Sequence, residues 1–150
     1  GSSCRMVLEG HTSNVRCVHQ QGGLIVSGGE PSVRVWDAAT GRQTCGLEGH
    51  GHYVSCLNLD KDRRMVSGSW DRTLKIWNLP EDGSEVRSVE TLEGHTASVL
   101  CLQTSFDRVA SGSLGGEVMV WNLLTGANSI STYADRGSAV NAIAWERNLL

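Results

Sequence analysis

The sequence has 150 residues, of which 39% are hydrophobic and 19% charged, so its composition is that of a folded chain rather than a disordered one. Thirteen basic and sixteen acidic residues give a net charge of −3, which argues against non-specific binding to nucleic acid or to a membrane surface. No apolar run approaches the length of about 20 residues that a membrane-spanning helix needs, and no secretory leader is expected.

Five cysteines lie outside any zinc-binding pattern. They stand at positions 4, 17, 45, 56 and 101, and no two of them form a CxxC pair. An odd number of cysteines fits a reducing compartment, so we expect an intracellular protein, cytoplasmic or nuclear, with no metal site and no cofactor. Three of the cysteines follow a valine in the same local pattern and are expected to be small core residues: Cys17, Cys56 and Cys101.

Three kinds of residue recur along the chain at steps of about 40 residues. They are a histidine in a Leu-Glu-Gly-His tetrapeptide, a serine in a Ser-Gly pair, and a tryptophan that closes each unit. In chain order these residues are His11, Ser27 and Trp36, then His50, Ser67 and Trp77, then His95, Ser111 and Trp121. Self-similarity at a fixed step is typical of a repeat protein.

Each repeat predicts four short β-strands, because its apolar residues alternate with polar ones between turn-forming residues. In the first repeat the strands are expected at residues 15–18, 24–27 and 33–36 and in the stretch that ends at Leu47. No stretch of ten or more residues has a helical period. Four strands in every 40 to 45 residues are typical of β-propeller blades, so the predicted fold is an all-β propeller.

The whole sequence, residues 1–150, is therefore predicted to be a partial propeller. Its expected parts are a lone strand at 1–8, blades at about 9–47, 48–92 and 93–134, and the start of a further blade at 135–150 that runs through Val140 and Trp145 to an opening strand at 148–150. Because closed propellers have about four to eight blades, we expect this sequence to be a fragment of a larger ring. Two open blade faces should then cause self-association or aggregation.

The order of these motifs resembles the WD-repeat (WD40) family. In that family a histidine, a serine, an aspartate and the tryptophan form a hydrogen-bonded network inside each blade. The resemblance implies the complete set only in the second repeat, which has Asp71 in its turn. The first repeat has the turn 29–32 without an aspartate, and the third has Gly115 in its place. We expect the second blade to be the stiffest, because a buried polar network stabilises only when every member has a partner.

The resemblance also implies a non-catalytic scaffold or adaptor that binds protein or peptide partners, rather than an enzyme. Ser67, His50 and Asp71 have the side chains of a nucleophilic triad, but no strained GxSxG turn is present, and we assign them to the network. Partners of the family dock on one face of the ring, near the first strand and the turn aspartate. The matching residues are Asn14, Arg16, Glu30, Tyr53, Ser55, Trp70, Ser98, Leu100 and Leu114.

Arg16 carries the most specific expectation. The segment 10–17 resembles the blades of F-box/WD substrate receptors of ubiquitin ligases, in which an arginine in this position contacts the phosphate of a phosphorylated degron. A guanidinium suits a phosphate because it donates two parallel hydrogen bonds. The matching positions of the other blades hold Ser55, Leu100 and Asn141, so a single arginine would make this contact.

Alternative interpretations remain open. Trp70 beside Tyr53 could serve as an apolar anchor for partners that carry no phosphate, or Trp70 could fold onto its own blade. A different class of function is a propeller enzyme, or a propeller that binds nucleic acid or lipid, with its site in blades outside this sequence.

Overall fold

The computed structural model describes residues 4–86 and 88–144, which form twelve β-strands and no helix. The strands are β1 (Cys17–Gln21), β2 (Leu24–Gly28), β3 (Val33–Asp37), β4 (Gln43–Leu47), β5 (Val54–Leu59), β6 (Arg64–Ser69), β7 (Leu74–Asn78), β8 (Ser88–Leu92), β9 (Val99–Ser105), β10 (Arg108–Ser113), β11 (Glu117–Asn122) and β12 (Asn128–Tyr133). They form three antiparallel sheets, in the orders β1-β2-β3-β4, β5-β6-β7-β8 and β9-β10-β11-β12, which we call blades one, two and three. The predicted all-β architecture is confirmed. A helix suited to crossing a membrane is not found in the described part of the chain.

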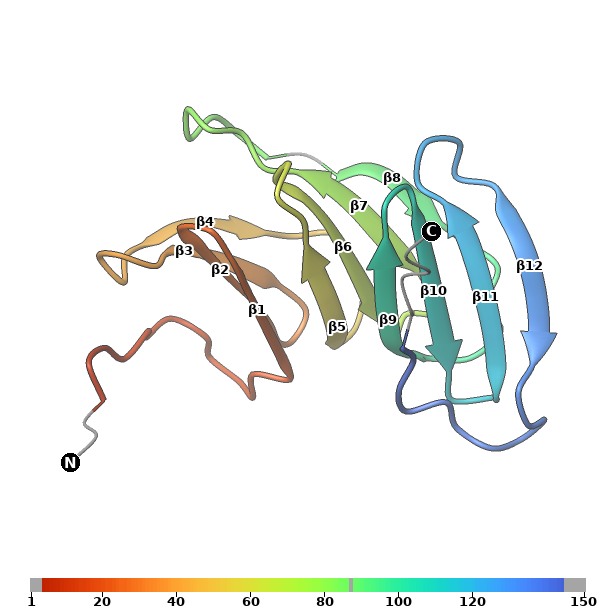
Figure 1. Ribbon diagram of the computed structural model, residues 1–150. Coiled ribbons are helices and arrows are strands. Elements are labelled where there is room, and N and C mark those ends of the chain that lie inside the picture. The colour runs from red at the N-terminus through yellow and green to blue at the C-terminus, as the bar shows by residue number, and fades with distance from the viewer. Residues whose placement is uncertain (1–3, 87, 145–150) are drawn as a thin grey trace.

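The three blades follow one another side by side in chain order (Figure 1). Their first strands lie next to each other, since β1 contacts β5 and β5 contacts β9. In each blade the pairing between the third and fourth strands shifts at the residue before the closing tryptophan. Such a shift re-aims a side chain. All three tryptophans are at most 2% exposed: Trp36, Trp77 and Trp121.

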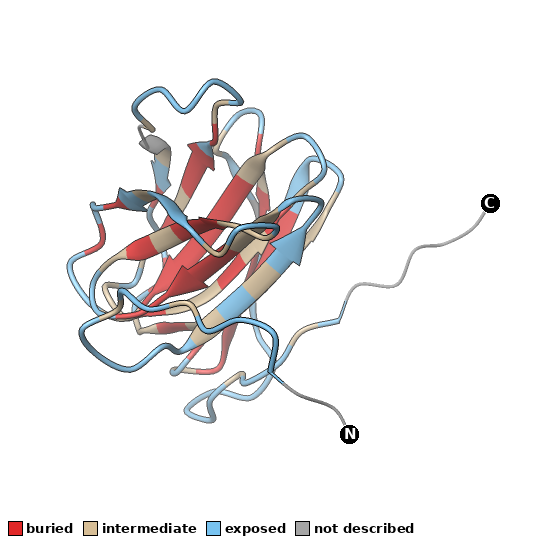
Figure 2. Ribbon diagram, turned by 90° about the vertical axis from the view of Figure 1, so that its left-hand side faces the viewer, coloured by how far each residue is buried: buried red, intermediate tan, exposed pale blue. Residues whose placement is uncertain are grey.

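The hydrophobic core lies between the blades rather than within one of them. One cluster joins Val26, Val33 and Val35 of blade one to residues of β5, β6 and β7 in blade two. A second cluster joins Leu74 and Ile76 of blade two to residues of β9, β10 and β11 in blade three. Buried residues accordingly occupy the middle of the strands, and the connecting loops are exposed (Figure 2). Each blade therefore buries its apolar face only against a neighbour.

A glycine in the second strand lets adjacent blades approach closely. A Cβ atom on Gly28 would lie 2.8 Å from Val54 Cγ1, and one on Gly68 would lie 2.8 Å from Val99 Cγ1. The cysteine of each first strand lies against the same glycine. Burial raises the pKa of the Cys17 and Cys56 thiols to about 12, so both remain protonated at neutral pH.

Two expected strands are wrong where the structure describes them. Residues 4–8 form no strand, and neither do residues 139–144. A strand needs a hydrogen-bonded partner strand, and none of the three sheets supplies one at these positions. The first strand of blade one also begins at Cys17 rather than at Val15. Trp145 and the strand expected at 148–150 lie outside the described residues.

Val140 nevertheless docks as the predicted fourth repeat implies. Its amide donates to the Ser113 carbonyl at 2.9 Å, as the amide of Val54 donates to the Gly29 carbonyl at 2.9 Å. Its side chain lies against Gly112, the equivalent of Gly28 and Gly68. The contact between successive blades is thus repeated a third time before any strand pairing is made.

The glycine contact predicts a position-specific effect on stability. Gly68→Ala should lower the free energy of unfolding by about 1–3 kcal/mol, because the added methyl group would overlap Cys56 and Val99. Urea denaturation followed by tryptophan fluorescence measures this change. Gly23→Ala is the matched control, since a Cβ at Gly23 meets no atom within 4 Å, and it should change stability by less than about 0.5 kcal/mol. Equal effects of the two substitutions would contradict the packing described.

Candidate functional site

Blade two contains a complete chain of polar contacts. Trp77 Nε1 donates to Ser67 Oγ at 2.9 Å, and Ser67 Oγ lies 2.7 Å from His50 Nε2. His50 Nδ1 lies 2.8 Å from Asp71 Oδ2. A carboxylate can only accept, so His50 carries its proton on Nδ1, and Nε2 accepts the hydroxyl proton of Ser67. Every donor in this chain has an acceptor.

These contacts exclude a nucleophilic role for the serine. Ser67 is 0% exposed, and its oxygen already accepts the indole proton while its own proton goes to His50. A nucleophile must reach its substrate, and this hydroxyl cannot. Ser67, His50 and Asp71 therefore hold the blade together rather than forming a triad that acts on a substrate.

The turn of blade two folds around the Asp71 carboxylate. It accepts from Thr73 Oγ1 at 2.7 Å, from the Thr73 amide at 2.9 Å and from the Gly51 amide at 3.0 Å. Burial alone would raise the pKa of Asp71, but the hydrogen bonds from His50, Thr73 and Gly51 outweigh it and lower the pKa well below its ordinary value. The ionised form is thus part of the folded blade.

Blade three replaces the expected aspartate by a residue that the sequence pattern did not reveal. Glu117, the first residue of β11, places Oε2 3.2 Å from His95 Nδ1, while His95 Nε2 lies 2.7 Å from Ser111 Oγ. The expectation that only the second repeat has the full network is therefore wrong. The longer glutamate side chain, starting two residues after Gly115, reaches the same histidine nitrogen. An acid at the start of an otherwise apolar strand was the available signal.

Blade one lacks this last contact. His11 Nε2 lies 2.7 Å from Ser27 Oγ, and Trp36 Nε1 donates to the same oxygen at 2.9 Å. No carboxylate of the described residues contacts His11 Nδ1. Burial and the charge of Arg34 lower the pKa of His11, so it is neutral at pH 7. The three blades thus share the serine contact and differ in the acid.

The exposed candidates come together at one end of the sheets, where β2, β6 and β10 finish. Arg16 lies with its guanidinium carbon 3.9 Å from the ring centre of Tyr53 and 4.8 Å from that of Trp70. The Tyr53 and Trp70 rings are 5.0 Å apart and meet edge to face at 86°. His52 packs beside both rings, at 4.7 Å from Tyr53 and 5.5 Å from Trp70. We call these four residues the Arg16 cluster.

The cluster spans two blades and is anchored through its backbone. The Arg16 amide donates to the Gly28 carbonyl at 2.8 Å, and the Trp70 amide donates to the Tyr53 carbonyl at 3.0 Å. Trp70 is half-buried, and its ring packs against Tyr53 and His52 of its own blade and against Arg16 of blade one. The sequence placed three of the four members on this face but did not single out His52.

The guanidinium of Arg16 is stacked on its faces and open at its edge. Within the described residues, its nitrogens make no hydrogen bond and no ion pair. Aromatic stacking uses only the faces of the planar group, so its N–H donors point away from the rings. An arginine held in this way can donate two parallel hydrogen bonds to an incoming anion at small cost in side-chain entropy.

The other candidate residues occupy different surroundings. Ser98 Oγ donates to the Trp70 carbonyl at 3.3 Å and so lies beside the cluster. Ser55 is turned toward the blade interface, where its hydroxyl contacts the carbonyls of Gly68 and Val99. Leu100 is half-buried on β9. The remaining candidates are exposed in loops at the same end of the sheets: Asn14, Glu30 and Leu114.

The described part of the chain contains no group of three His, Cys, Asp or Glu side chains placed to hold a metal ion.

Comparison with known proteins places these repeats in one family model. Residues 2–37, 41–78 and 86–122 match the family described as WD domain, G-beta repeat. Two computationally designed proteins have similar crystal structures. Ika4 superposes with a TM-score of 0.83 at 31% identity, covering 95% of this chain and 86% of Ika4. Ika8 superposes with a TM-score of 0.84 at 31% identity, covering 94% of this chain and 43% of Ika8.

Natural relatives are longer than this chain. Autophagy-related protein 16 of Arabidopsis thaliana is 29% identical, over 93% of this chain and 27% of the relative. Cell division control protein 4 of Saccharomyces cerevisiae is 31% identical, over 96% of this chain and 21% of the relative. Mitochondrial division protein 1 of Schizosaccharomyces pombe is 32% identical, over 72% of this chain and 19% of the relative. The chain thus spans between 19% and 27% of these proteins' lengths.

The depressed pKa of Asp71 predicts how stability depends on pH. Because the folded pKa lies below the ordinary value of 3.8, the carboxylate stabilises the fold fully above about pH 5 and loses this effect as the pH falls. Asp71→Asn should lower the free energy of unfolding by about 1–3 kcal/mol at pH 7.

The difference between this variant and the unmodified chain should shrink between about pH 4 and pH 2, in urea denaturation repeated across that range. Asp62→Asn, at an exposed turn, is the control and should have little effect at either pH. A difference that stays constant with pH would mean that Asp71 is not ionised in the folded blade.

Proposed function

The chain belongs to the WD-repeat family, and from this premise we propose that it is a non-catalytic scaffold that binds protein or peptide partners through the Arg16 cluster. The observation that supports this proposal is the arginine stacked on two aromatic rings with its donor edge open. Tryptophan, tyrosine and arginine are the residues most often found at the energetic centres of protein interfaces. All three are adjacent in this cluster.

The cluster suits a partner that combines an apolar surface with a negative charge. The half-buried rings of Tyr53 and Trp70 supply apolar contact area. Arg16 supplies the positive charge, in a chain whose net charge is −3, so the charge acts locally rather than by attracting anions over the whole surface. Leu114 is 54% exposed in a loop at the same end of the sheets and would extend the apolar contact.

The more specific proposal concerns the kind of partner. Arg16 occupies the position that resembles the phosphate-contacting arginine of F-box/WD receptors, and a phosphate ester accepts two hydrogen bonds from a guanidinium edge. We therefore propose that the partner is a phosphorylated segment and that the chain is the substrate-recognition part of an F-box-type ubiquitin ligase. An intracellular location, cytoplasmic or nuclear, belongs to the same proposal.

A peptide array tests both levels of this proposal. The array holds matched phosphorylated and unmodified peptides and is probed with the chain and with Arg16→Ala. Phosphorylated peptides should bind at least about tenfold more tightly than unmodified ones, and the preference should disappear in Arg16→Ala. Added salt should weaken the binding, because the contact is between charges at the surface.

Trp70→Ala separates the two levels. It should weaken phosphorylated and unmodified peptides by a similar factor, of about tenfold, because it removes apolar contact rather than the phosphate donor. Arg42→Ala, which removes an exposed arginine from the turn after β3, is the matched control and should bind like the unmodified chain. Binding that ignores both the phosphate and Arg16 would refute the phosphate receptor but leave the scaffold, whereas binding that also ignores Trp70 would refute the site.

We further propose that the outer face of blade one causes the chain to self-associate. Val15 is 54% exposed, whereas its counterparts Val54 and Val99 are 0% exposed under a preceding blade. Val18 is 65% exposed, whereas its counterpart Leu57 is 9% exposed. The same repeat positions that form the core elsewhere are thus open on this face. Contiguous apolar surface of this kind favours association.

Light scattering measures the result. The chain should have a mass above its 16.2 kDa at micromolar concentrations, and Val18→Glu should shift it toward the monomer because a charge cannot be buried without a partner. Leu124→Glu introduces the same charge at a residue that is 70% exposed in a turn of blade three, and it should leave the mass unchanged. A monomer at every concentration would contradict the proposal.

A further inference from the structure

A second concave site lies between blades one and two, away from the Arg16 cluster. Its volume is about 350 Å³, which is in the range of pockets that hold small ligands or side chains. Leu24, which lines it, pairs with Gln21 at the opposite end of β1 and β2 from Cys17 and Gly28. The pocket therefore lies at the other end of the sheets from Arg16.

An insertion in blade two builds one wall of this pocket. β8 begins ten residues after β7 ends, whereas the corresponding strands of blades one and three begin six residues after their neighbours. The longer connection contributes Leu79, Glu81 and Val86 to the lining. In repeat proteins, insertions that depart from the repeat commonly carry binding functions, because the repeat itself needs only the short turn.

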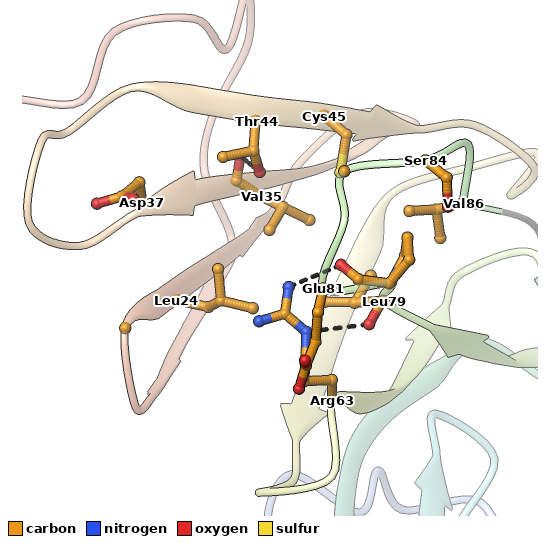
Figure 3. A pocket seen from close by; sticks show the side chains of 13 residues that line it. Leu24, Val35, Asp37, Thr44, Cys45, Arg63, Leu79, Glu81, Ser84 and Val86 are labelled. Carbon is orange, nitrogen blue, oxygen red and sulfur yellow. Dashed lines mark hydrogen bonds between the residues drawn. The ribbon is translucent and has the colours of Figure 1, made fainter.

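Arg63 fixes the inserted loop and presents a positive charge to the pocket. Its Nε donates to the Leu79 carbonyl at 3.0 Å and one Nη to the Pro80 carbonyl at 2.9 Å. The third nitrogen points toward Leu24 in Figure 3 and makes no hydrogen bond within the described residues. No ion pair joins Arg63 to a carboxylate of the described residues. A half-buried cation without a counter-charge favours an anionic ligand.

The remaining walls are mostly apolar. Leu24, Val35, Leu79 and Val86 face the space around Arg63 (Figure 3). Cys45 also lines it, and burial raises the pKa of its thiol against the opposing charge of Arg63, so the thiol adds an uncharged surface. Two acids limit the negative charge that a ligand can bring. Asp37 is held by the amides of its own turn, and Glu81 is exposed at the rim.

An edge strand borders the pocket. Thr44 and Cys45 belong to β4, which is the last strand in the order β1-β2-β3-β4 and pairs only with β3 in the described sheets. An unpaired edge accepts an extended peptide as an additional strand, and alternate side chains of that peptide point to the same side. A peptide beside β4 would thus direct side chains two residues apart into the pocket.

We propose that this pocket binds an extended peptide segment of a partner protein, with an aliphatic side chain and, two residues later, a carboxylate. The aliphatic group packs on the walls formed by Leu24, Val35 and Val86. The carboxylate accepts from the free nitrogen of Arg63. A single carboxylate is favoured over an acidic run, because Asp37 and Glu81 repel further negative charge. This site is independent of the Arg16 cluster and of the function proposed for it.

Fluorescence anisotropy with synthetic peptides tests the proposal. The probes are blocked, labelled eight-residue peptides of alternating threonine and valine that contain Leu-x-Glu, Leu-x-Gln or Ala-x-Glu. The Leu-x-Glu peptide should bind at least about tenfold more tightly than either of the others, since each lacks one of the two contacts. Equal binding of Leu-x-Glu and Leu-x-Gln, or no binding at about 1 mM, would overturn it.

Three variants test where the peptide binds. Cys45→Tyr fills the pocket without changing charge and should weaken Leu-x-Glu at least about tenfold. Glu81→Gln removes a rim charge and should tighten it about twofold to threefold, as for an exposed charge pair. Arg63→Gln should abolish the preference for glutamate over glutamine, and Glu48→Gln, at an exposed residue outside the pocket, is the control and should change nothing.

Amide chemical shifts then distinguish this site from the first one. On addition of Leu-x-Glu, the shifts of Thr44 to Gly46 and of Val86 should change, while those of Arg16 and Trp70 should not. Changes confined to the Arg16 cluster, or weaker binding by Glu81→Gln, would overturn the proposal. Loss of binding by Arg16→Ala with an intact response to Cys45→Tyr would likewise count against an independent site.

Discussion

The structure depends on the face-to-face packing of each blade on the next. A valine that precedes the first strand of one blade fits against a glycine in the second strand of the blade before it, as Val54 does at Gly28 and Val99 at Gly68. Both valines are fully buried. Since the core lies between sheets, the position of each blade is set by its neighbours, and a surface built from two blades is as well defined as one blade alone.

The polar network adds a second constraint that acts within each blade. The shared contact is a serine that accepts from the tryptophan and meets the histidine, so the segment before the first strand is tied to the second and third strands. The acid that completes the network differs between blades and is absent from the described contacts of blade one. The family pattern thus tolerates a change of acid provided that the carboxylate reaches the same histidine nitrogen.

Both candidate binding sites are products of blade-to-blade packing. Arg16 belongs to blade one, but its guanidinium is positioned by rings of blade two. The pocket at the other end of the sheets likewise combines β4 of blade one with the inserted loop of blade two, held by Arg63. Neither site is part of a single repeat, which explains how a structural repeat can carry binding properties that its motifs do not specify.

The sequence by itself determined the all-β class, the three repeats and most strands, because strand alternation, turn residues and the recurring histidine, serine and tryptophan are local and periodic. It also indicated that Arg16, Tyr53 and Trp70 share one face. Only the tertiary structure decided that Glu117 replaces the missing aspartate, that His52 joins the cluster and that Ser55 turns inward, because these depend on side-chain reach between strands. The strands expected at 4–8 and 139–144 did not form, since strand formation requires a hydrogen-bonded neighbour, which no local pattern can supply.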